Sequence, residues 1–487
     1  MNMKFFSEFK LSAPVQKAIE LLEFKSPTKV QQKVIPTVLE EKDIIVKSQT
    51  GSGKTAAFGI PLCDLIDWEE NKPQALVLAP TRELAIQVKE DLFNLGRFKR
   101  LKVAAVYGKS PFHIQERQLK QKTHIVVGTP GRVIDHIEKG TLDCSQVKYL
   151  VIDEADEMLN MGFIDQLDAI ITSVPEDRVT MLFSATLPDR IESLCQVYMK
   201  DPMIVEIDEE NSATDRIEQV RIQSSQKGKL QLLKEISIVE NPDSCIIFCN
   251  TQVQVDEVEE MLSELNYSCD KIHGGMEQRD RLRVMNDFKS GFYRYLIATD
   301  VAARGIDVDN ISLVVNYDVP QDPERYVHRI GRTGRKGKSG RAVTFFAHYE
   351  ERYLQAIHDY IGKEIEEVDR PSFEVIEEAR VAFEEKIGEI PEEKESKGAQ
   401  LNEGIVKLHI NAGKKTKMRA VDIVGTLCNI DGMTAEDIGI INIMDISTFV
   451  EILHDKGEMV YQVLQKKPIK GRIRRVSMVD LERDLRY

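Results

Sequence analysis

The 487-residue sequence has no long apolar run, and no stretch approaches the roughly 20 apolar residues that a membrane-spanning helix needs. Its first ten residues, MNMKFFSEFK, lack the apolar core of a secretory signal. The seven cysteines are scattered and form no C-x-x-C pair, which argues against a disulfide framework or a zinc site. We therefore expect a cytoplasmic chain with reduced thiols, and a prior of about 150 residues per domain predicts about three domains.

An overall surplus of basic residues is also missing, because the formal net charge is −14. The distribution is uneven: residues 401–487 hold 14 basic and 12 acidic residues, whereas residues 1–400 hold 52 and 68. Two tight basic clusters, 414–419 and 466–475, lie in this last segment. Because local patches govern affinity for polyanions, the negative total does not exclude a nucleic-acid partner.

Short apolar runs alternate with amphipathic stretches over most of the chain, which predicts α/β domains with parallel sheets covered by helices. In the first part, the predicted strands are 44–46, 75–79, 103–106, 124–127, 149–152 and 179–183. In the second part, they are 217–222, 245–248, 295–298, 313–315 and 342–346. The polar stretch 208–215 predicts a linker between two domains, 1–207 and 216–363.

The remaining sequence predicts a smaller third domain. Residues 364–404 are acidic and interrupted by prolines, so we expect a helix at 374–387 and then a flexible tether. Within 405–487 the predicted strands are 406–410, 438–444, 449–453 and 472–476, and the predicted helices are 417–428 and 455–465. The order βαββαβ is typical of a small ferredoxin-like or RRM-like α+β domain.

A glycine-rich segment lies between the first predicted strand and a predicted helix. This context predicts a loop whose backbone N–H groups bind nucleotide phosphates. Its residues are Ser48, Gln49, Thr50, Gly51, Ser52, Gly53, Lys54 and Thr55, with Ser48 where the strict pattern has glycine. We expect Lys54 to reach the β- and γ-phosphates and the Thr55 hydroxyl to bind Mg²⁺. The alternative is a glycine-rich turn without a ligand.

Two acidic residues, Asp153 and Glu154, directly follow the apolar run 149–152. Ligands of α/β sheets bind at the carboxyl ends of strands, so we expect both side chains beside the nucleotide. Asp153 would hold Mg²⁺, partly through water, and Glu154 would orient and deprotonate the attacking water. The alternative is that these acids cap the next helix. Together with the phosphate loop, they predict hydrolysis of a nucleoside triphosphate.

The segment 326–335 contains three arginines at intervals of three residues, Arg329, Arg332 and Arg335. Because guanidinium groups match phosphate oxygens, we expect Arg332 and Arg335 to be arginine fingers that complete the hydrolytic site from the second domain. The alternative is a solvated basic face of a helix.

Residues 1–360 resemble the DEAD-box RNA helicases, in nearly ten motifs that occur in the family's order. The resemblance implies two RecA-like domains, ATP and Mg²⁺ as cofactors, and RNA as the partner. It implies a Q motif within 3–31, in which Gln31 reads the adenine edge, Phe6 stacks on the ring and Phe24 belongs to the same site, and ATP binding across 32–205. The resemblance further implies that Asp307 contacts the ribose of ATP. The residues that it assigns to coupling between hydrolysis and RNA binding are Asp156, Ser184, Thr186 and His328.

The same resemblance implies RNA contacts that hold the sugar–phosphate chain without reading bases. These residues are Pro80, Thr81, Arg82, Thr129, Gly131 and Arg132 in the first domain, and Gly274, Gly275, Arg281 and Thr299 in the second. Tyr107-Gly108-Lys109 departs from the family's Gly-Gly after an aromatic residue, so we expect one RNA-facing loop to differ.

Residues 405–479 resemble the C-terminal RNA-binding domain of the DbpA/YxiN subgroup, notably at 410–415. This resemblance implies recognition of a 23S rRNA hairpin during assembly of the large ribosomal subunit. The first and third strands offer only His409 and Phe449 for stacking on bases, so we expect a surface that follows phosphates instead. Its predicted residues are Lys414, Lys415, Lys417, Arg419, Arg472, Arg474 and Arg475. A solubilising basic face is the alternative.

These patterns favour an ATP-dependent RNA helicase that acts as a monomer and separates short RNA duplexes. Two other functions stay open: an ATP-gated RNA clamp or annealing chaperone without net unwinding, and a phosphate-loop ATPase that acts on DNA or protein. A duplex-separation assay distinguishes the first of these, and a comparison of RNA with DNA as the activator distinguishes the second.

Overall fold

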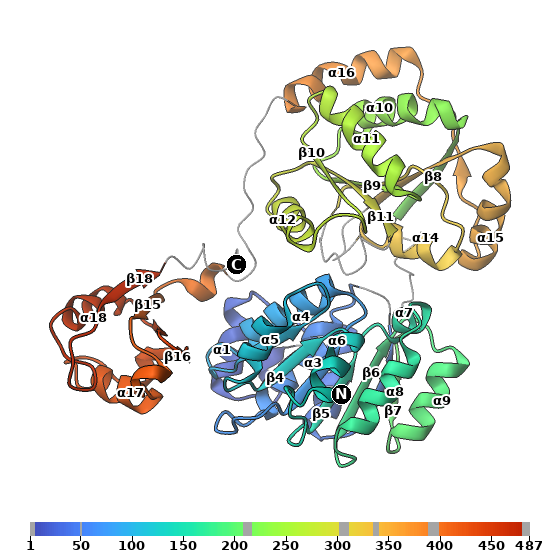
Figure 1. Ribbon diagram of the computed structural model, residues 1–487. Coiled ribbons are helices and arrows are strands. Elements are labelled where there is room, and N and C mark those ends of the chain that lie inside the picture. Colours follow the sequence, from blue (N-terminus) through green and yellow to red (C-terminus); the bar gives the residue numbers. More distant parts are fainter. Residues whose placement is uncertain are drawn as a thin grey trace. The chain divides into compact units, whose positions relative to one another are not determined.

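The computed structural model describes residues 5–48, 51–207, 217–300, 311–334, 340–387 and 399–479 (Figure 1). These residues form two seven-stranded sheets and one four-stranded sheet. The predicted linker 208–215 lies outside them. None of the helices in these ranges is both long and apolar enough to cross a membrane.

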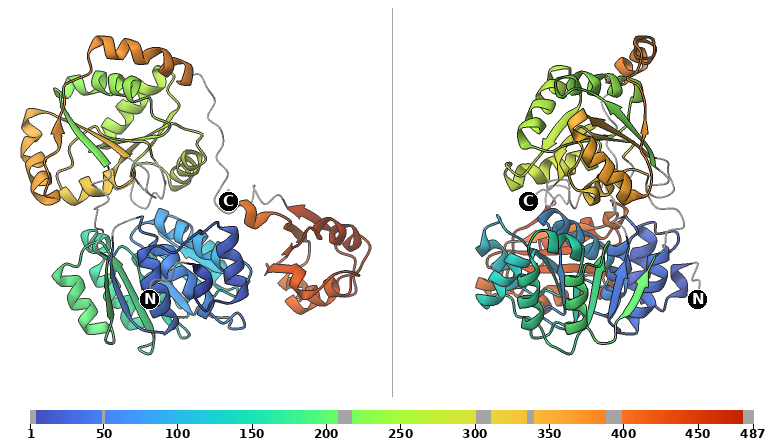
Figure 2. Two further views of the ribbon diagram at one scale, coloured as in Figure 1. Left: turned by 180° about the vertical axis from the view of Figure 1, so that it is seen from behind. Right: turned by 90° about the vertical axis from the view of Figure 1, so that its right-hand side faces the viewer.

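The first domain is built on a parallel sheet in the order β3-β4-β2-β5-β6-β1-β7. All residues of β2, β4 and β5 are buried, which requires cover on both faces of the sheet, and helices lie on either side of it (Figure 2). The strands are β1 (Ile44–Lys47), β2 (Ala75–Leu78), β3 (Val103–Val106), β4 (Ile125–Gly128), β5 (Tyr149–Ile152), β6 (Val179–Ser184) and β7 (Met203–Glu206). The helices are α1 (Ala13–Leu21), α2 (Lys29–Leu39), α3 (Lys54–Leu65), α4 (Arg82–Leu95), α5 (Phe112–Leu119), α6 (Pro130–Glu138), α7 (Ala155–Asn160), α8 (Ile164–Ser173) and α9 (Asp189–Tyr198).

Six of these strands lie where the apolar runs predict them, and β7 is the exception. This strand pairs with β1 alone, at the edge of the sheet. Its Met203 and Ile204 side chains are 48% and 61% exposed, so only Val205 contributes to the core. An edge strand with one buried residue lacks the continuous apolar run that marks a central parallel strand.

The second domain repeats this architecture, with a parallel sheet in the order β10-β11-β9-β12-β13-β8-β14. Its strands are β8 (Ile217–Gln223), β9 (Cys245–Cys249), β10 (Cys269–Ile272), β11 (Tyr295–Thr299), β12 (Leu313–Asn316), β13 (Gly340–Phe346) and β14 (Glu366–Glu367). Its helices include α10 (Lys229–Glu240), α11 (Gln252–Glu264), α12 (Gln278–Lys289), α14 (Pro323–Ile330), α15 (Glu351–Ile361) and α16 (Phe373–Ile387). The apolar runs predict neither β10 nor β14, which lie at the two edges.

The helix expected at 374–387 is present as α16 and belongs to the packing of the second domain. Its Ile376 and Phe383 side chains are buried in the same core as Leu232 and Leu233 of α10. The core of the second domain therefore extends well beyond the predicted boundary at residue 363.

The C-terminal sheet is antiparallel, in the order β16-β17-β15-β18. Its elements follow the predicted βαββαβ order: β15 (Val406–Ile410), α17 (Ala420–Cys428), β16 (Ile438–Ile443), β17 (Thr448–Ile452), α18 (Gly457–Leu464) and β18 (Val476–Val479). The fourth strand begins four residues later than predicted, because Ile469 and Arg472 form a tight turn at Gly471, which has φ of 74°. Glycine adopts this left-handed conformation without steric cost. The predicted fold class, two RecA-like α/β domains and an α+β domain, is confirmed.

Candidate nucleotide- and RNA-binding sites

The carboxyl ends of the strands in the first sheet separate the predicted ATP residues from the predicted RNA residues. The neighbours β5, β6 and β1 end at Asp153-Glu154, Ser184 and the phosphate loop. The neighbours β3, β4 and β2 end near Gly108, Thr129 and Thr81. One edge of one sheet thus presents two adjacent functional regions, as expected for a parallel sheet.

The phosphate loop has the left-handed backbone that its glycines permit. Gly51 and Gly53 have φ of 82° and 87°, and α3 begins at the next residue, Lys54. A Cβ atom on Gly53 would lie 2.6 Å from Gln31 Nε2, so a side chain there would displace the Gln31 amide and would be strained by the positive φ. Lys54 is 7% exposed and its Nζ donates to the Ser48 carbonyl over 3.3 Å. Gln49 and Thr50 lie outside the described residues.

Gln31 connects the start of α2 with the phosphate loop. Its Oε1 accepts from the Thr28 N–H over 3.0 Å, and the Thr28 hydroxyl accepts from the Gln31 N–H over 3.3 Å, which together form a capping box. The Gln31 Nε2 donates to the Gly53 carbonyl over 3.2 Å. The amide that is predicted to read adenine is therefore also bonded to the phosphate loop.

The aromatic residues of the Q motif differ in exposure. Phe6 is buried, with ring centroids 6.1 Å from both Phe9 and Phe24, whereas Phe24 is 36% exposed. Stacking of Phe6 on the adenine ring stays a prediction.

The acidic pair at the end of β5 is held in an unusual geometry. Burial raises the pKa of the Asp153 carboxyl to about 7, while the positive charge of Lys54 opposes this shift. Glu154 has φ of 53° and ψ of 54°, the left-handed region that side chains other than Asn, Asp and Gly rarely adopt. Its N–H donates to Asp153 Oδ1 over 3.0 Å. Such strain is commonly found where a side chain must be aimed at a ligand.

These residues fit ATP with Mg²⁺. The loop has a left-handed backbone at Gly51 and Gly53, and Lys54 is a buried cation beside it. Burial disfavours the ionised form of the Asp153 carboxyl, and a bound divalent cation would stabilise that form. Thr55 and Asp153 are the side chains that would hold the ion, and their roles stay predictions.

Hydrogen bonds join the ends of β5, β6 and β1 to one another. Asp156 Oδ2 accepts from the N–H groups of Ala185 and Thr186, each over 3.0 Å, and the Asp156 N–H donates to the Ser184 hydroxyl over 3.1 Å. The Ser48 N–H donates to the Ser184 carbonyl over 3.0 Å. Three of the residues predicted to couple hydrolysis to RNA binding, Asp156, Ser184 and Thr186, are therefore bonded to one another, and Ser184 is also bonded to the phosphate loop.

The predicted RNA residues of the first domain lie at helix starts. The Thr81 hydroxyl caps α4 by accepting from the Leu84 N–H over 3.2 Å, and Thr129 precedes Pro130 at the start of α6. Arg132 donates to the Ser110 carbonyl and to Gln115 Oε1 over 2.9 and 2.8 Å, which fixes its guanidinium group. Pro80 precedes Thr81, Arg82 lies beside Gly108, and Gly131 is exposed.

In the second domain, the predicted RNA residues lie at the ends of neighbouring strands. Gly274 and Gly275 follow β10, and Thr299 ends β11. Arg281 is buried in α12. His328 lies in α14, and Arg332 follows that helix, 7% exposed, with its Nε donating to the His328 carbonyl over 3.3 Å. Arg335 and Asp307 lie outside the described residues.

The first arginine of the cluster, Arg329, has a role that the sequence does not indicate. It is 1% exposed, and it donates to Asp300 Oδ2 over 2.8 Å and to Asn250 Oδ1 over 2.9 Å. A solvated basic face is therefore wrong for Arg329. Asp300 directly follows β11, and nothing in the sequence pattern pairs it with Arg329.

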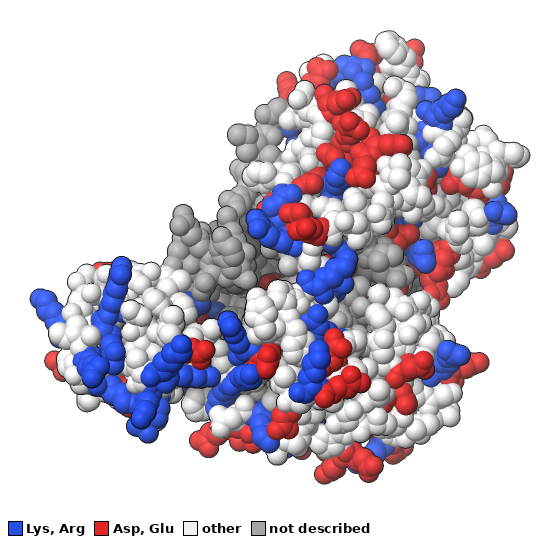
Figure 3. All heavy atoms as spheres, viewed as in Figure 1, with Lys and Arg blue, Asp and Glu red and all other residues white. Residues whose placement is uncertain are grey.

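The two basic clusters of the C-terminal domain are brought together by Lys470, a residue outside the predicted set. Its Nζ donates to Asp422 Oδ2 over 2.9 Å and to the carbonyl of Lys417. Figure 3 shows Lys and Arg side chains gathered over the surface of this domain. Exposed members of the two clusters are Lys414, Lys415, Lys417, Arg419, Lys466, Lys470, Arg472 and Arg475, whereas Lys467 and Arg474 are partly buried. His409 and Phe449 are cross-strand neighbours, with ring centroids 5.0 Å apart.

Three family models match the chain in the order of its domains. Residues 28–194 match the DEAD/DEAH box helicase model, 228–337 match the helicase conserved C-terminal domain, and 407–478 match the DbpA RNA binding domain. The ATP-dependent RNA helicase DbpA of Bacillus subtilis (strain 168) is 56% identical over 475 residues, which cover 98% of this chain and 99% of that protein. The DEAD-box ATP-dependent RNA helicase CshA of Geobacillus kaustophilus is 44% identical and matches 80% of this chain and 84% of its own length.

Solved structures show the same likeness. Dbp5 of S. cerevisiae bound to RNA and ADP BeF3 has a TM-score of 0.70 and 31% identity, covering 79% of this chain and all of that one. Mss116p bound to ssRNA and AMP-PNP has a TM-score of 0.68 and 30% identity, covering 79% of this chain and 82% of that one. The phosphate loop, the acidic segment and the paired RecA-like sheets are those of a nucleic-acid-dependent ATPase. The chain belongs to the DEAD-box family of ATP-dependent RNA helicases.

Proposed function

We propose that this helicase locally unwinds short RNA duplexes in 23S rRNA during assembly of the large ribosomal subunit. The observation that carries the proposal is the C-terminal domain, which matches the DbpA RNA binding domain and exposes two basic clusters joined through Lys470. Such a surface suits phosphates, and it supports targeting because it lies outside the residues that match the two helicase models. We include a monomeric state and a cytoplasmic location in the proposal, since ribosomal RNA precursors are found there.

The proposed chemistry at the first sheet rests on the roles that the sequence predicts for the individual residues. Lys54 would neutralise the β- and γ-phosphates, Thr55 and Asp153 would hold Mg²⁺, and Glu154 would orient the attacking water and accept its proton. Bound Mg²⁺ would neutralise charge on the phosphates. Arg332 and Arg335 are the proposed arginine fingers, and Gln31, Phe6, Phe24 and Asp307 the proposed nucleoside contacts.

The proposed RNA grip uses backbone and side-chain groups at the strand ends that lie beside the ATP residues. In the first sheet these are Pro80 to Arg82 and Thr129 to Arg132. Pro80 follows β2, which neighbours β5, and the bonds of Asp156 with Ala185 and Thr186 join the segment after β5 to the segment after β6. If RNA raises the affinity for ATP through these contacts, ATP must raise the affinity for RNA by the same factor. A strand-separation assay tests whether this coupling unwinds duplexes. ATP hydrolysis without strand release would favour an RNA clamp or annealing chaperone.

Removing residues 401–487 tests the targeting role. We expect the truncated protein to retain ATP hydrolysis stimulated by generic RNA, because both RecA-like domains are intact, but to lose its preference for a 23S rRNA fragment. The measurement is the RNA concentration that gives half-maximal ATPase rate, for the fragment and for random RNA at the same salt. A truncated protein that still prefers the fragment would show that the C-terminal domain does not select the RNA.

Charge removal within the intact chain tests the basic surface more sharply. We expect the triple change Lys415→Ala, Lys470→Ala and Arg472→Ala to flatten the plot of log affinity against log salt by about two to three, since each lost phosphate contact removes about 0.7–0.9 from the slope. The matched control is alanine at Lys10, Lys227 and Lys363, which are exposed lysines of the two helicase domains. If both triple variants had the same slope of log affinity against log salt, the basic surface would not contact phosphates and would serve solubility instead.

A further inference from the structure

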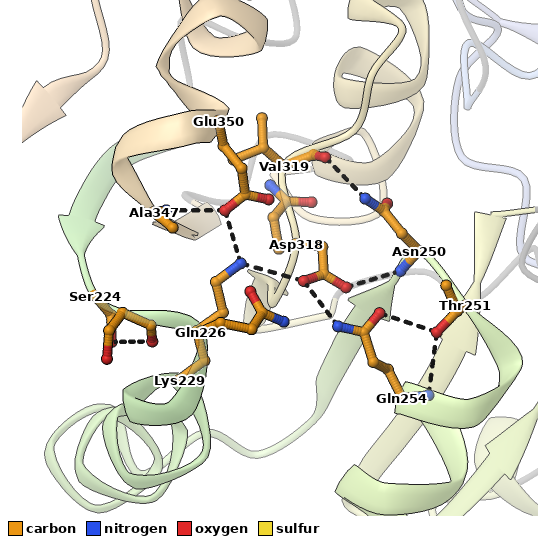
Figure 4. Close-up of polar contacts among 12 residues, drawn as sticks. Ser224, Gln226, Lys229, Asn250, Thr251, Gln254, Asp318, Val319, Ala347 and Glu350 are labelled. Carbon is orange, nitrogen blue, oxygen red and sulfur yellow. Dashed lines mark hydrogen bonds and ion pairs between the residues drawn. The ribbon is translucent and has the colours of Figure 1, made fainter.

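The second domain contains a fully buried lysine that the proposed chemistry does not use. Lys229 is the first residue of α10, and its side chain has no exposed surface. Its Nζ lies between two carboxylates, 2.9 Å from Glu350 Oε2 and 3.2 Å from Asp318 Oδ1 (Figure 4). Burying three ionised groups is costly, so such a cluster is weak evidence for stability as its purpose.

The three charged residues come from neighbouring strands. Lys229 follows β8, Glu350 follows β13 and Asp318 follows β12, and these strands are adjacent in the sheet. Glu350 is fixed independently, because its Oε2 also accepts from the Ala347 N–H over 2.8 Å. Lys229 therefore connects Glu350, whose side chain is held by the Ala347 N–H, with Asp318.

Asp318 contacts the end of the next strand, β9. Its Oδ2 accepts from the Asn250 N–H over 3.0 Å, and its Oδ1 accepts from Gln254 Nε2 over 3.3 Å (Figure 4). Asn250 Nδ2 in turn donates to the Val319 carbonyl over 3.0 Å. One carboxylate thus holds the segment that begins α11.

That segment lies beside the residues proposed to bind RNA. The Thr251 hydroxyl caps α11 by accepting from the Gln254 N–H over 3.2 Å. A Cβ atom on Gly275 would lie 2.7 Å from Gln252 Oε1, so Gln252 is packed directly on the glycine pair after β10. A displacement of the start of α11 would be transmitted to Gly275.

The same carboxylate residue also contacts the helix that precedes the proposed arginine finger. Arg329 Nη1 donates to the Asp318 carbonyl over 2.7 Å, and Arg329 Nη2 donates to Asn250 Oδ1 over 2.9 Å. Arg329 lies in α14, three residues before Arg332. Asp318 and Asn250 consequently bond to one another and to Arg329, and Asn250 lies two residues before Gln252, which is packed on Gly275.

We propose that Lys229 is a positioning residue that holds Asp318 so that RNA contact at Gly274 and Gly275 is transmitted through Asn250 and Arg329 to Arg332. The proposal rests on the roles proposed above for the glycine pair and for Arg332. Without the ammonium group, two buried carboxylates would be left without their cation, and Asp318 would move toward water or become protonated. Either change alters the acceptor that Asn250 and Gln254 require.

The experiment compares three variants of the full-length chain with the unchanged protein, using polyuridylate as a generic RNA, so that targeting by the C-terminal domain is not involved. The variants are Lys229→Met, the double variant Lys229→Met/Glu350→Gln, and the control Glu235→Gln. Glu235 is also a buried carboxylate of α10, but it pairs with Arg370. RNA-stimulated kcat, the RNA concentration for half-maximal rate, RNA-free ATP affinity and Tm are measured, with the kinetic assays well below the lowest Tm.

We expect Lys229→Met to lose about tenfold in RNA stimulation, within the range by which such residues change coupling, while ATP affinity without RNA stays within about twofold. The double variant removes one unpaired buried charge, so its Tm should recover toward that of the unchanged protein while its RNA stimulation stays low. The Glu235→Gln control should be stimulated normally.

Recovery of RNA stimulation together with Tm in the double variant would overturn the proposal, since Lys229 would then serve stability alone. Normal stimulation of a folded Lys229→Met variant would overturn it as well. If Lys229→Met does not fold, the double variant decides by the same two measurements, and failure of both to fold would assign Lys229 to folding. Absence of RNA stimulation in the unchanged protein would instead count against the enzyme class itself.

Discussion

Replacing Lys54 by alanine is expected to abolish ATP hydrolysis and to weaken ATP binding. The side chain is a buried cation at the start of α3, directly after Gly53, whose left-handed backbone would strain any other residue. Its loss removes a buried positive charge beside the predicted triphosphate, and removal of a single stabilising donor from such a site costs about 10²–10³ in kcat. Steady-state ATPase rates at saturating RNA and equilibrium binding of a fluorescent ATP analogue measure the two effects.

Lys47 provides the control for this substitution. It ends β1 and directly precedes Ser48, the first residue of the loop, but its side chain is 47% exposed and pairs at the surface with Glu206. Lys47→Ala should therefore hydrolyse ATP normally. Ordinary turnover by Lys54→Ala would mean that the loop does not bind the phosphates.

Replacing Glu154 by glutamine should separate binding from turnover. The amide keeps the size of the side chain and cannot accept a proton from water, and a positioned general base contributes about 10²–10⁴-fold to rate. We expect kcat to fall by that factor while ATP and RNA remain bound together, which a gel-shift assay with radiolabelled RNA and ATP would detect as a long-lived complex.

The companion variant for this experiment is Glu192→Gln, which changes an exposed carboxylate in α9. It should match the unchanged protein in rate and in complex lifetime. If Glu154→Gln lost ATP binding, the residue would be structural rather than the base. If it hydrolysed ATP at the ordinary rate, another group would have to deprotonate the water.

Much of the fold follows from local sequence, because buried parallel strands need continuous apolar residues and the phosphate loop needs glycine. Tyr149–Ile152, a central strand whose four residues are all buried, is predicted correctly for this reason. β10 is missed because Asp270 and Lys271 interrupt its short run, and both are partly exposed at the edge of the sheet. The pairing of that strand with β11 depends on the rest of the fold rather than on its own residues.

The limits of sequence reasoning are clearest for polar side chains. A lysine in an amphipathic segment is ordinarily assigned to the solvent face, yet Lys229 is fully buried between two carboxylates. The sequence does not reveal this, because the two partners lie 89 and 121 residues further along the chain. The left-handed backbone at Glu154 is equally hidden, since glutamate has no preference for it. In contrast, the functional assignment of Glu154 depends only on its place after an apolar strand, which the sequence shows.

The backbone of Glu154 has a consequence for heat resistance. A left-handed conformation costs an ordinary residue about 1–2 kcal/mol. Glycine would remove this cost, but it has no carboxylate to accept a proton from the water. Selection for thermostability therefore cannot relax this position without giving up the base. A heat-adapted version of this protein would have to gain its extra stability elsewhere and keep one strained peptide at the end of β5.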